Sequence, residues 1–218
     1  MAQEIRNFLL LANRACDAKN YYEGNRYYLK VLEIDPENYM ALFGKFFTSG
    51  MNLSARNYSV AETDYYLKLY LQYAPELYVN DGIKFREEQC TDKQQEELNI
   101  IFYRLIELGR HLIDLKSKVP IEQCNFMLLY ALKILTFAYH TPVKENELQK
   151  QKLQTDLIST IKYLISSYHL MLQFDPNIKS QGFFQFARKT LYLSATTTNS
   201  LTYLESDPGI SKKFLELF

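Results

Sequence analysis

The side chains that most often carry out chemistry in enzymes are spread thinly along this chain. The three histidines are His111, His140 and His169. None belongs to an HExxH-type motif or to a His/carboxylate cluster with metal-ligand spacing, so each predicts a surface position or a hydrogen-bonded core position. Glutamates occur as the adjacent pairs Glu87–Glu88 and Glu96–Glu97. Neighbours on a helix point to different faces, so neither pair suits two-carboxylate acid–base catalysis.

Other signatures of catalysis and cofactor binding are also missing. The glycines are scattered and form no phosphate-binding loop, and no GxSxG motif occurs. The three cysteines, Cys16, Cys90 and Cys124, contain no CxxC spacing, which argues against a disulfide framework and against zinc. We therefore expect a non-enzymatic, cytoplasmic protein with no catalytic residues, metal or cofactor. A helical enzyme with scattered catalytic residues is the alternative.

Charge and hydropathy narrow the possible partners. The chain has 218 residues, with 25 Lys and Arg against 25 Asp and Glu, and 47% apolar residues. This composition excludes a disordered chain and a nucleic-acid binder that depends on net charge. The longest apolar stretch, 126–139, includes Lys133 and is shorter than the ~20 residues of a membrane span. The apolar run 8–12 is too short for a secretion signal, so we expect neither a signal nor a span.

Helical periodicity dominates the sequence and predicts an all-α protein of about eight or nine helices. The predicted helices cover about 5–16, 21–34, 39–47, 59–74, 98–115, 120–139, 145–174, 182–194 and 211–217. Three parts follow: helical hairpins at 1–75, an irregular connection at 76–90 with an Asn-Asp-Gly turn signal, and a bundle at 91–218. The stretch 126–137 is apolar on nearly every face, which is typical of a central helix.

Local signals predict where several helices begin and end. Asp35–Pro36 should end the second helix, because a residue before proline is disfavoured in the α region. Ser59 with Glu62, and Thr91 with Gln94, have the spacing of capping boxes. The β-branched polar run 196–199 predicts a loop.

Residues 5–38 resemble one tetratricopeptide repeat. The match consists of Phe8, Leu11 and Ala12 in the first helix, and Gly24, Tyr28, Val31 and Pro36 in the second. The same run is similar to the helical part of Gram-positive proteins that place a zinc ribbon before such a repeat, although no ribbon is present here. The resemblance implies helix pairs that pack closely through small residues, followed by an irregular bundle, in a bacterial or phage protein. Lys45 and Phe46 depart from the pattern in the next helix pair.

In tetratricopeptide folds the first helix of each pair lines a groove that binds peptides. The resemblance places Leu9, Asn13, Asp17, Phe43 and Phe47 in that groove. It implies a protein-interaction module that binds a partner helix or peptide, with the two phenylalanines as apolar anchors. Alternatively, Phe43 and Phe47 are buried beneath a following helix.

The second interpretation of function is a self-assembling structural subunit. Residues 1–109 carry 12 basic and 16 acidic side chains, a net charge of −4, and residues 110–218 carry 13 and 9, a net charge of +4. Opposite charges would favour docking between copies in a homo-oligomer. The tyrosine pairs at 21–22, 27–28 and 65–66 should each place one ring towards the core and the other towards the surface.

Overall fold

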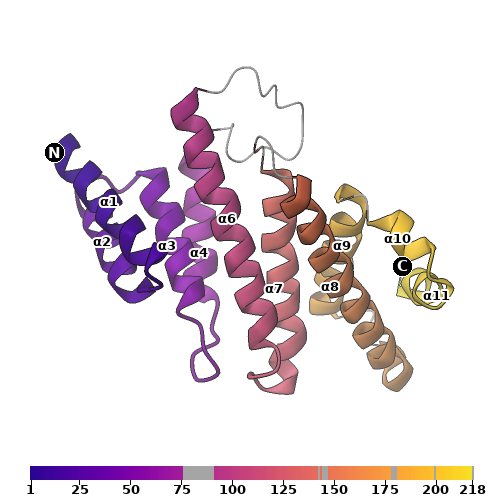
Figure 1. Ribbon diagram of the computed structural model, residues 1–218. Helices are drawn as coiled ribbons and strands as arrows, with labels where there is room; N and C mark the ends of the chain where they lie inside the picture. Colours follow the sequence, from indigo (N-terminus) through magenta and orange to yellow (C-terminus); the bar gives the residue numbers. More distant parts are fainter. Residues whose placement is uncertain (76–90, 142, 144–146, 178–180, 199, 218) are drawn as a thin grey trace. The chain divides into compact units, whose positions relative to one another are not determined.

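The computed structural model describes residues 1–75, 91–141, 143, 147–177, 181–198 and 200–217. Regular secondary structure in these segments is helical, apart from one isolated bridge between Ser54 and Asn57 (Figure 1). The prediction of an all-α protein is therefore confirmed. The chain divides into two compact units, 1–104 and 105–218, with the boundary inside helix α6 (Asp92–Leu115). The predicted connection at 76–90 lies outside the described residues.

The first unit contains α1 (Ala2–Asp17), α2 (Tyr21–Ile34), α3 (Tyr39–Met51), α4 (Ala61–Tyr73) and the first half of α6. Successive helices from α1 to α4 pack against one another (Figure 1). Between α1 and α2 the chain turns through Lys19, whose φ of 61° is left-handed. The Asn20 N–H bonds to the Ala15 carbonyl at 2.8 Å, which closes the end of α1. The Asn20 side chain then accepts from the Glu23 N–H and caps α2.

Two glycines allow the helices of this unit to approach closely. A Cβ at Gly24 would lie within 2.6 Å of the Cys16 sulfur, and one at Gly44 would overlap the ring of Tyr28. These residues therefore set the spacing of α2 against α1 and α3. Helix α3 is the centre of the unit, because ten consecutive residues, Ala41–Gly50, are buried. Ten consecutive residues include every face of a helix, so α3 is surrounded by packed side chains on all sides.

The second unit contains the rest of α6, then α7 (Ile121–His140), α8 (Glu147–Phe174), α9 (Gly182–Thr197), α10 (Leu201–Glu205) and α11 (Pro208–Leu217). Helix α7 packs on both α8 and α9, and α11 packs on α8. The run Met127–Leu132 is wholly buried, which confirms that α7 is central. Gly109 lies against the Leu135 side chain, where a Cβ would overlap it.

Of the local sequence signals for helix ends and loops, some predicted the structure correctly and others did not. Thr91 and Gln94 form the predicted capping box, since the N–H of each residue bonds to the side chain of the other. The box predicted for Ser59 and Glu62 is wrong: α4 begins at Ala61 with no side-chain cap, and Glu62 contacts Lys45 instead. Thr196 and Thr197 belong to α9 rather than to a loop. Their hydroxyls bond to backbone carbonyls of the preceding turn, which satisfies both groups within the helix.

Candidate functional site

The residues predicted to line a groove come together in the first unit. Leu9, Asn13 and Asp17 are spaced by four on α1, and Phe43 and Phe47 by four on α3, so each set shares a helix face. One pocket of about 130 Å³ is lined by Leu9, Asn13, Phe43 and Phe47 together with Tyr28, Met40, Gly44, Glu97, Ile100 and Arg104. Four of the five predicted residues therefore share one pocket. We call the surface formed by these four residues the α1/α3 groove.

Helix α6 provides the remaining side of this pocket. Glu97, Ile100 and Arg104 follow an i, i+3, i+7 spacing and therefore lie along one face of the helix. The Tyr39 hydroxyl donates to a Glu97 carboxylate oxygen at 2.8 Å. At the other end of this face, the Arg104 guanidinium donates to the carboxylate of Asp17. Residues 97–104 thus lie along the α1/α3 groove, held by one polar contact at Glu97 and another at Arg104.

Arg104 has a second role in the groove. Its guanidinium carbon lies 4.8 Å from the centre of the Phe47 ring, a cation–π distance. The side chain of Arg104 is 11% exposed and that of Asp17 is 72% exposed, so the pair joins a buried cation to a carboxylate at the rim. Asp17 lies outside the pocket and acts as the anchor of Arg104.

The two phenylalanines are buried rather than exposed. Phe43 is 2% and Phe47 is 1% exposed, which matches the alternative interpretation that a following helix covers them. Phe43 also packs against Tyr70 of α4, with ring centres 5.3 Å apart. A partner could reach these rings only by replacing a part of the chain that now covers them. Their assignment as partner-binding anchors stays a prediction.

A part-buried polar pair lies in the lining of the groove. The Tyr28 hydroxyl donates to the Asn13 side-chain oxygen at 2.7 Å. Burial, with a smaller contribution from Cys16, raises the pKa of Tyr28 far above its usual value. Tyr28 is therefore a neutral donor at any physiological pH. The pocket combines apolar walls with a few fixed polar groups, which suits recognition of a side chain.

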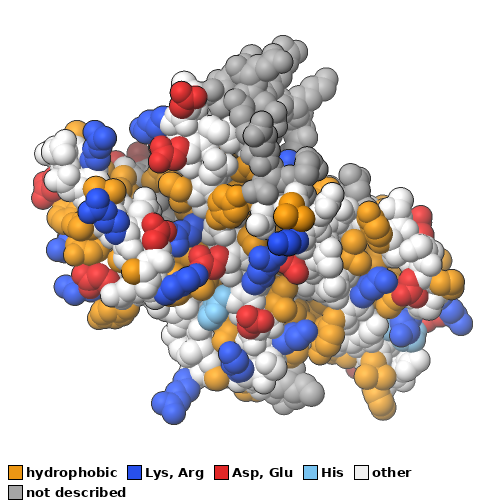
Figure 2. Space-filling view, viewed as in Figure 1, with side chains coloured by type: hydrophobic (Ala, Val, Ile, Leu, Met, Phe, Trp, Pro, Cys, Tyr) orange, Lys and Arg blue, Asp and Glu red, His pale blue; other side chains and the backbone are white. Residues whose placement is uncertain are grey.

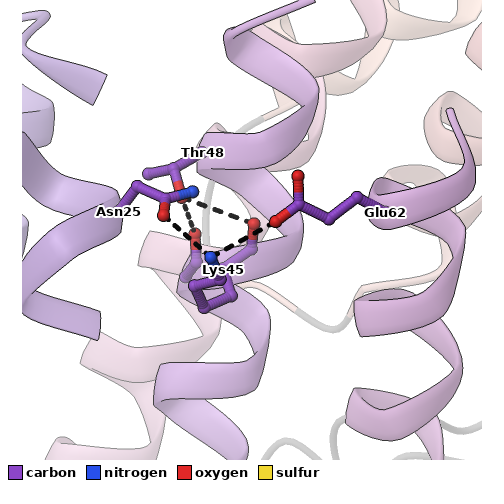
Figure 3. Close-up of polar contacts among 5 residues, drawn as sticks. Asn25, Lys45, Thr48 and Glu62 are labelled. Carbon is purple, nitrogen blue, oxygen red and sulfur yellow. Dashed lines mark hydrogen bonds and ion pairs between the residues drawn. The ribbon is translucent and has the colours of Figure 1, made fainter. Parts of the chain in front are cut away.

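A second polar cluster lies on the other side of α3 (Figure 3). The Lys45 ammonium donates to the Asn25 side-chain oxygen at 2.8 Å and to Glu62 at 3.4 Å. It also lies 4.8 Å from the centre of the Tyr66 ring. Asn25 in turn donates to the Thr48 hydroxyl at 3.2 Å, and that hydroxyl donates to the Gly44 carbonyl. The buried ammonium of Lys45 thus connects α2, α3 and α4.

Several titratable residues of the second unit lie in pairs within the part of the chain that the structure describes. His169 of α8 lies 2.6 Å from a Glu216 oxygen of α11. The Cys124 sulfur lies 3.8 Å from the Tyr163 hydroxyl, and Lys116 lies over the Tyr163 ring. Among the described residues, no three His, Cys, Asp or Glu side chains are grouped as metal ligands would be. Acidic and basic side chains are interspersed on the face of the molecule drawn in Figure 2.

Comparisons of the chain with protein-family models, with curated proteins and with solved structures find no match. The resemblance of residues 5–38 to a tetratricopeptide repeat therefore stays a prediction. No helix in the described parts of the chain combines the length and apolar character needed to cross a membrane. Sequence reasoning missed Glu97, Ile100 and Arg104, whose i, i+3, i+7 spacing was a usable but weak signal.

Proposed function

We propose that this protein is a non-enzymatic protein-interaction module whose α1/α3 groove binds a partner helix. The observation that carries the proposal is that residues 97–104 of the chain's own helix α6 lie along this groove. Helix-in-groove recognition depends on a face of residues spaced by three, four and seven, with apolar contacts at its centre. Glu97, Ile100 and Arg104 have this arrangement, with the apolar residue between two polar contacts.

The polar contacts give the groove a direction. The carboxylate of Asp17 at one end attracts a cation, and the Tyr39 hydroxyl at the other end donates to a carboxylate. A helix that enters in the opposite direction would place its acidic group beside Asp17. Like charges in contact are unfavourable, so the groove selects orientation as well as shape.

The test uses a labelled peptide with the sequence of residues 92–104 and the full chain with Arg104→Glu. This substitution places a carboxylate beside Asp17 and should release the chain's own segment. We expect saturable binding in fluorescence anisotropy, because the free peptide still carries the arginine that pairs with Asp17. The unaltered chain should bind the peptide much more weakly, because its tethered segment competes at high effective concentration.

The matched control is the double variant Asp17→Arg with Arg104→Glu. It restores an ion pair within the chain in reversed polarity, so its own segment should stay in place and the peptide should be excluded. Circular dichroism confirms that each variant retains its helices. If Arg104→Glu keeps its helical signal but shows no saturable peptide binding, the groove does not accept a helix and the proposal is wrong.

A further inference from the structure

We infer that the α1/α3 groove is shaped for a partner helix with a large aromatic residue at the position that Ile100 occupies in α6. The partner would carry a glutamate three positions before that aromatic and an arginine four positions after it. The chain's own segment is then a ligand that fills the groove incompletely and keeps it closed until such a helix replaces it. This inference rests on the proposed function and adds the chemistry of the partner.

The first observation is the space left beside Ile100. The pocket between α1, α3 and the Glu97–Arg104 face of α6 is partly open to solvent and has a volume of about 130 Å³. One water molecule takes about 30 Å³ in the liquid, so this space could hold a much larger group. Ile100 is the apolar side chain of α6 that lines it. The neighbouring residues Leu98, Ile101 and Phe102 are fully buried, whereas Ile100 is only partly buried.

The second observation is the character of the walls. Leu9, Met40, Phe43 and Phe47 form an apolar lining, and Asn13 and Tyr28 add polar atoms. An apolar body with a polar tip describes tryptophan and tyrosine, which bury a large ring and donate one hydrogen bond. An aliphatic side chain such as isoleucine offers no group for the polar atoms. The lining therefore matches an aromatic side chain with a donor better than the residue now present.

The third observation is that the flanking polar contacts fix the register. Glu97 bonds to Tyr39 and Arg104 pairs with Asp17, which places position 100 over the pocket. A partner helix that makes both contacts must place its residue of position 100 in the same space. Because the partner helix must replace the chain's own segment, its affinity depends on the difference in binding free energy between the two helices rather than on all the contacts it makes.

The experiment uses the absence of tryptophan from this chain. Two peptides of residues 92–104 are compared with the unaltered one, one with Ile100→Trp and one with Tyr103→Trp. Tyr103 is 47% exposed, so a tryptophan there is the matched control. Each peptide is titrated against the full chain with Arg104→Glu, and the tryptophan emission and the dissociation constant are measured.

We expect the Ile100→Trp peptide to bind at least about tenfold more tightly than the unaltered peptide, since burial of only two further methylene-sized groups, at roughly fourfold each, gives about sixteenfold. Its emission should shift to shorter wavelength on binding. The Tyr103→Trp peptide should bind as the unaltered peptide does and keep solvent-exposed emission. Equal affinity of all three peptides would overturn this inference while leaving the proposed function intact. Failure of every peptide to bind would overturn both.

A second measurement places the tryptophan in the chain itself. The full-length Ile100→Trp variant should emit at short wavelength and should unfold at a temperature no lower than the unaltered chain. Solvent-like emission with a lowered midpoint would show that the pocket does not accept a large ring, and would overturn the inference. Light scattering on the Arg104→Glu chain tests whether a second copy of the chain occupies the groove instead. A dimer that exchanges its 92–104 segments and excludes the Ile100→Trp peptide would also overturn the inference.

Discussion

Replacement of Lys45 by methionine tests whether the buried cation stabilises the first unit. The Lys45 side chain is 5% exposed, and its ammonium contacts Asn25 at 2.8 Å, Glu62 at 3.4 Å and the Tyr66 ring. A hydrogen bond to a charged group contributes about 1.5–3 kcal/mol. The Glu62 side chain is 61% exposed, so that ion pair contributes at most about 1 kcal/mol.

These contributions oppose the cost of burying the charge. Methionine keeps most of the packing of the lysine stem and removes the charge, so part of the desolvation cost is recovered. We therefore expect Lys45→Met to lower the free energy of unfolding of the first unit by about 1–2 kcal/mol. Lys45→Ala also removes the buried stem, and its expected cost is about 3–5 kcal/mol. Glu62→Gln should cost less than about 0.5 kcal/mol, because its carboxylate is exposed.

The assay is urea unfolding combined with hydrogen exchange. Urea curves followed by circular dichroism give the free energy of unfolding, and hydrogen exchange locates the change. Amides of α2, α3 and α4 should lose protection in Lys45→Met, and amides of α8 serve as the internal reference. A Lys45→Met chain that is as stable as the unaltered one would refute the reasoning. It would show that the cluster in Figure 3 only compensates for an unfavourable lysine.

Three further substitutions test single contacts. Lys19→Gly should stabilise the chain by about 0.5–1 kcal/mol in thermal unfolding, because glycine adopts the left-handed φ of 61° without a steric penalty. Tyr28→Phe should destabilise it by about 1 kcal/mol in urea unfolding, because Asn13 loses its donor. Asp207→Ala should reduce the protection of the α11 amides in hydrogen exchange, because the Asp207 carboxylate accepts hydrogen bonds from the Ile210 N–H and from the Lys162 ammonium. The same contacts, the Ile210 bond foremost, lower the pKa of Asp207. Their stabilisation is therefore present above the usual aspartate pKa and is lost as the pH falls through the lowered one, so the difference from Asp207→Ala should disappear in acid.

Helix positions were the part of the fold that sequence reasoning predicted best, because the responsible signals are local. Helix α2 ends at Ile34, directly before Asp35–Pro36, as the restriction on the residue before proline predicts. The tyrosine pairs also divide as a 100° turn per residue requires. Tyr28 is buried beside a partly exposed Tyr27, and Tyr22 is 72% exposed beside a partly buried Tyr21.

Capping and loop predictions failed where a distant partner decided the outcome. Glu62 had the spacing of a capping box, but the buried ammonium of Lys45 lies within its reach. Such a contact across 17 residues leaves no trace in the local pattern. The threonine run at the end of α9 has low helix propensity, yet Thr196 and Thr197 satisfy their hydroxyls on carbonyls of the preceding turn. Tertiary packing of α9 on α7 then outweighs a small difference in propensity.

The candidate site likewise has a part that local sequence patterns predict and a part that depends on distant contacts. Positions spaced by four on α1 and α3 could be assigned to shared helix faces from the sequence, and four of those five residues do share a pocket. The occupant of the groove could not be assigned. The contacts that hold it, Tyr39 with Glu97 and Asp17 with Arg104, join residues 58 and 87 positions apart. No periodicity or motif connects positions at such separations, and charge alone offers Asp17 many equally suitable cations.

A groove that is already occupied imposes a thermodynamic signature on any partner. If a helix were added to an open groove, it would bury the rings of Phe43 and Phe47 anew and produce a large negative heat-capacity change. In this chain both rings are buried beforehand, at 2% and 1% exposed. When a partner helix replaces the 92–104 segment, the two rings are covered both before and after the exchange. Little additional apolar area is therefore removed from water at the groove. The heat-capacity change of the unaltered chain should therefore be smaller than that of the Arg104→Glu chain with the same peptide in isothermal titration calorimetry. Equal values for the two chains would mean that the peptide binds elsewhere, because only the groove differs in its starting occupancy.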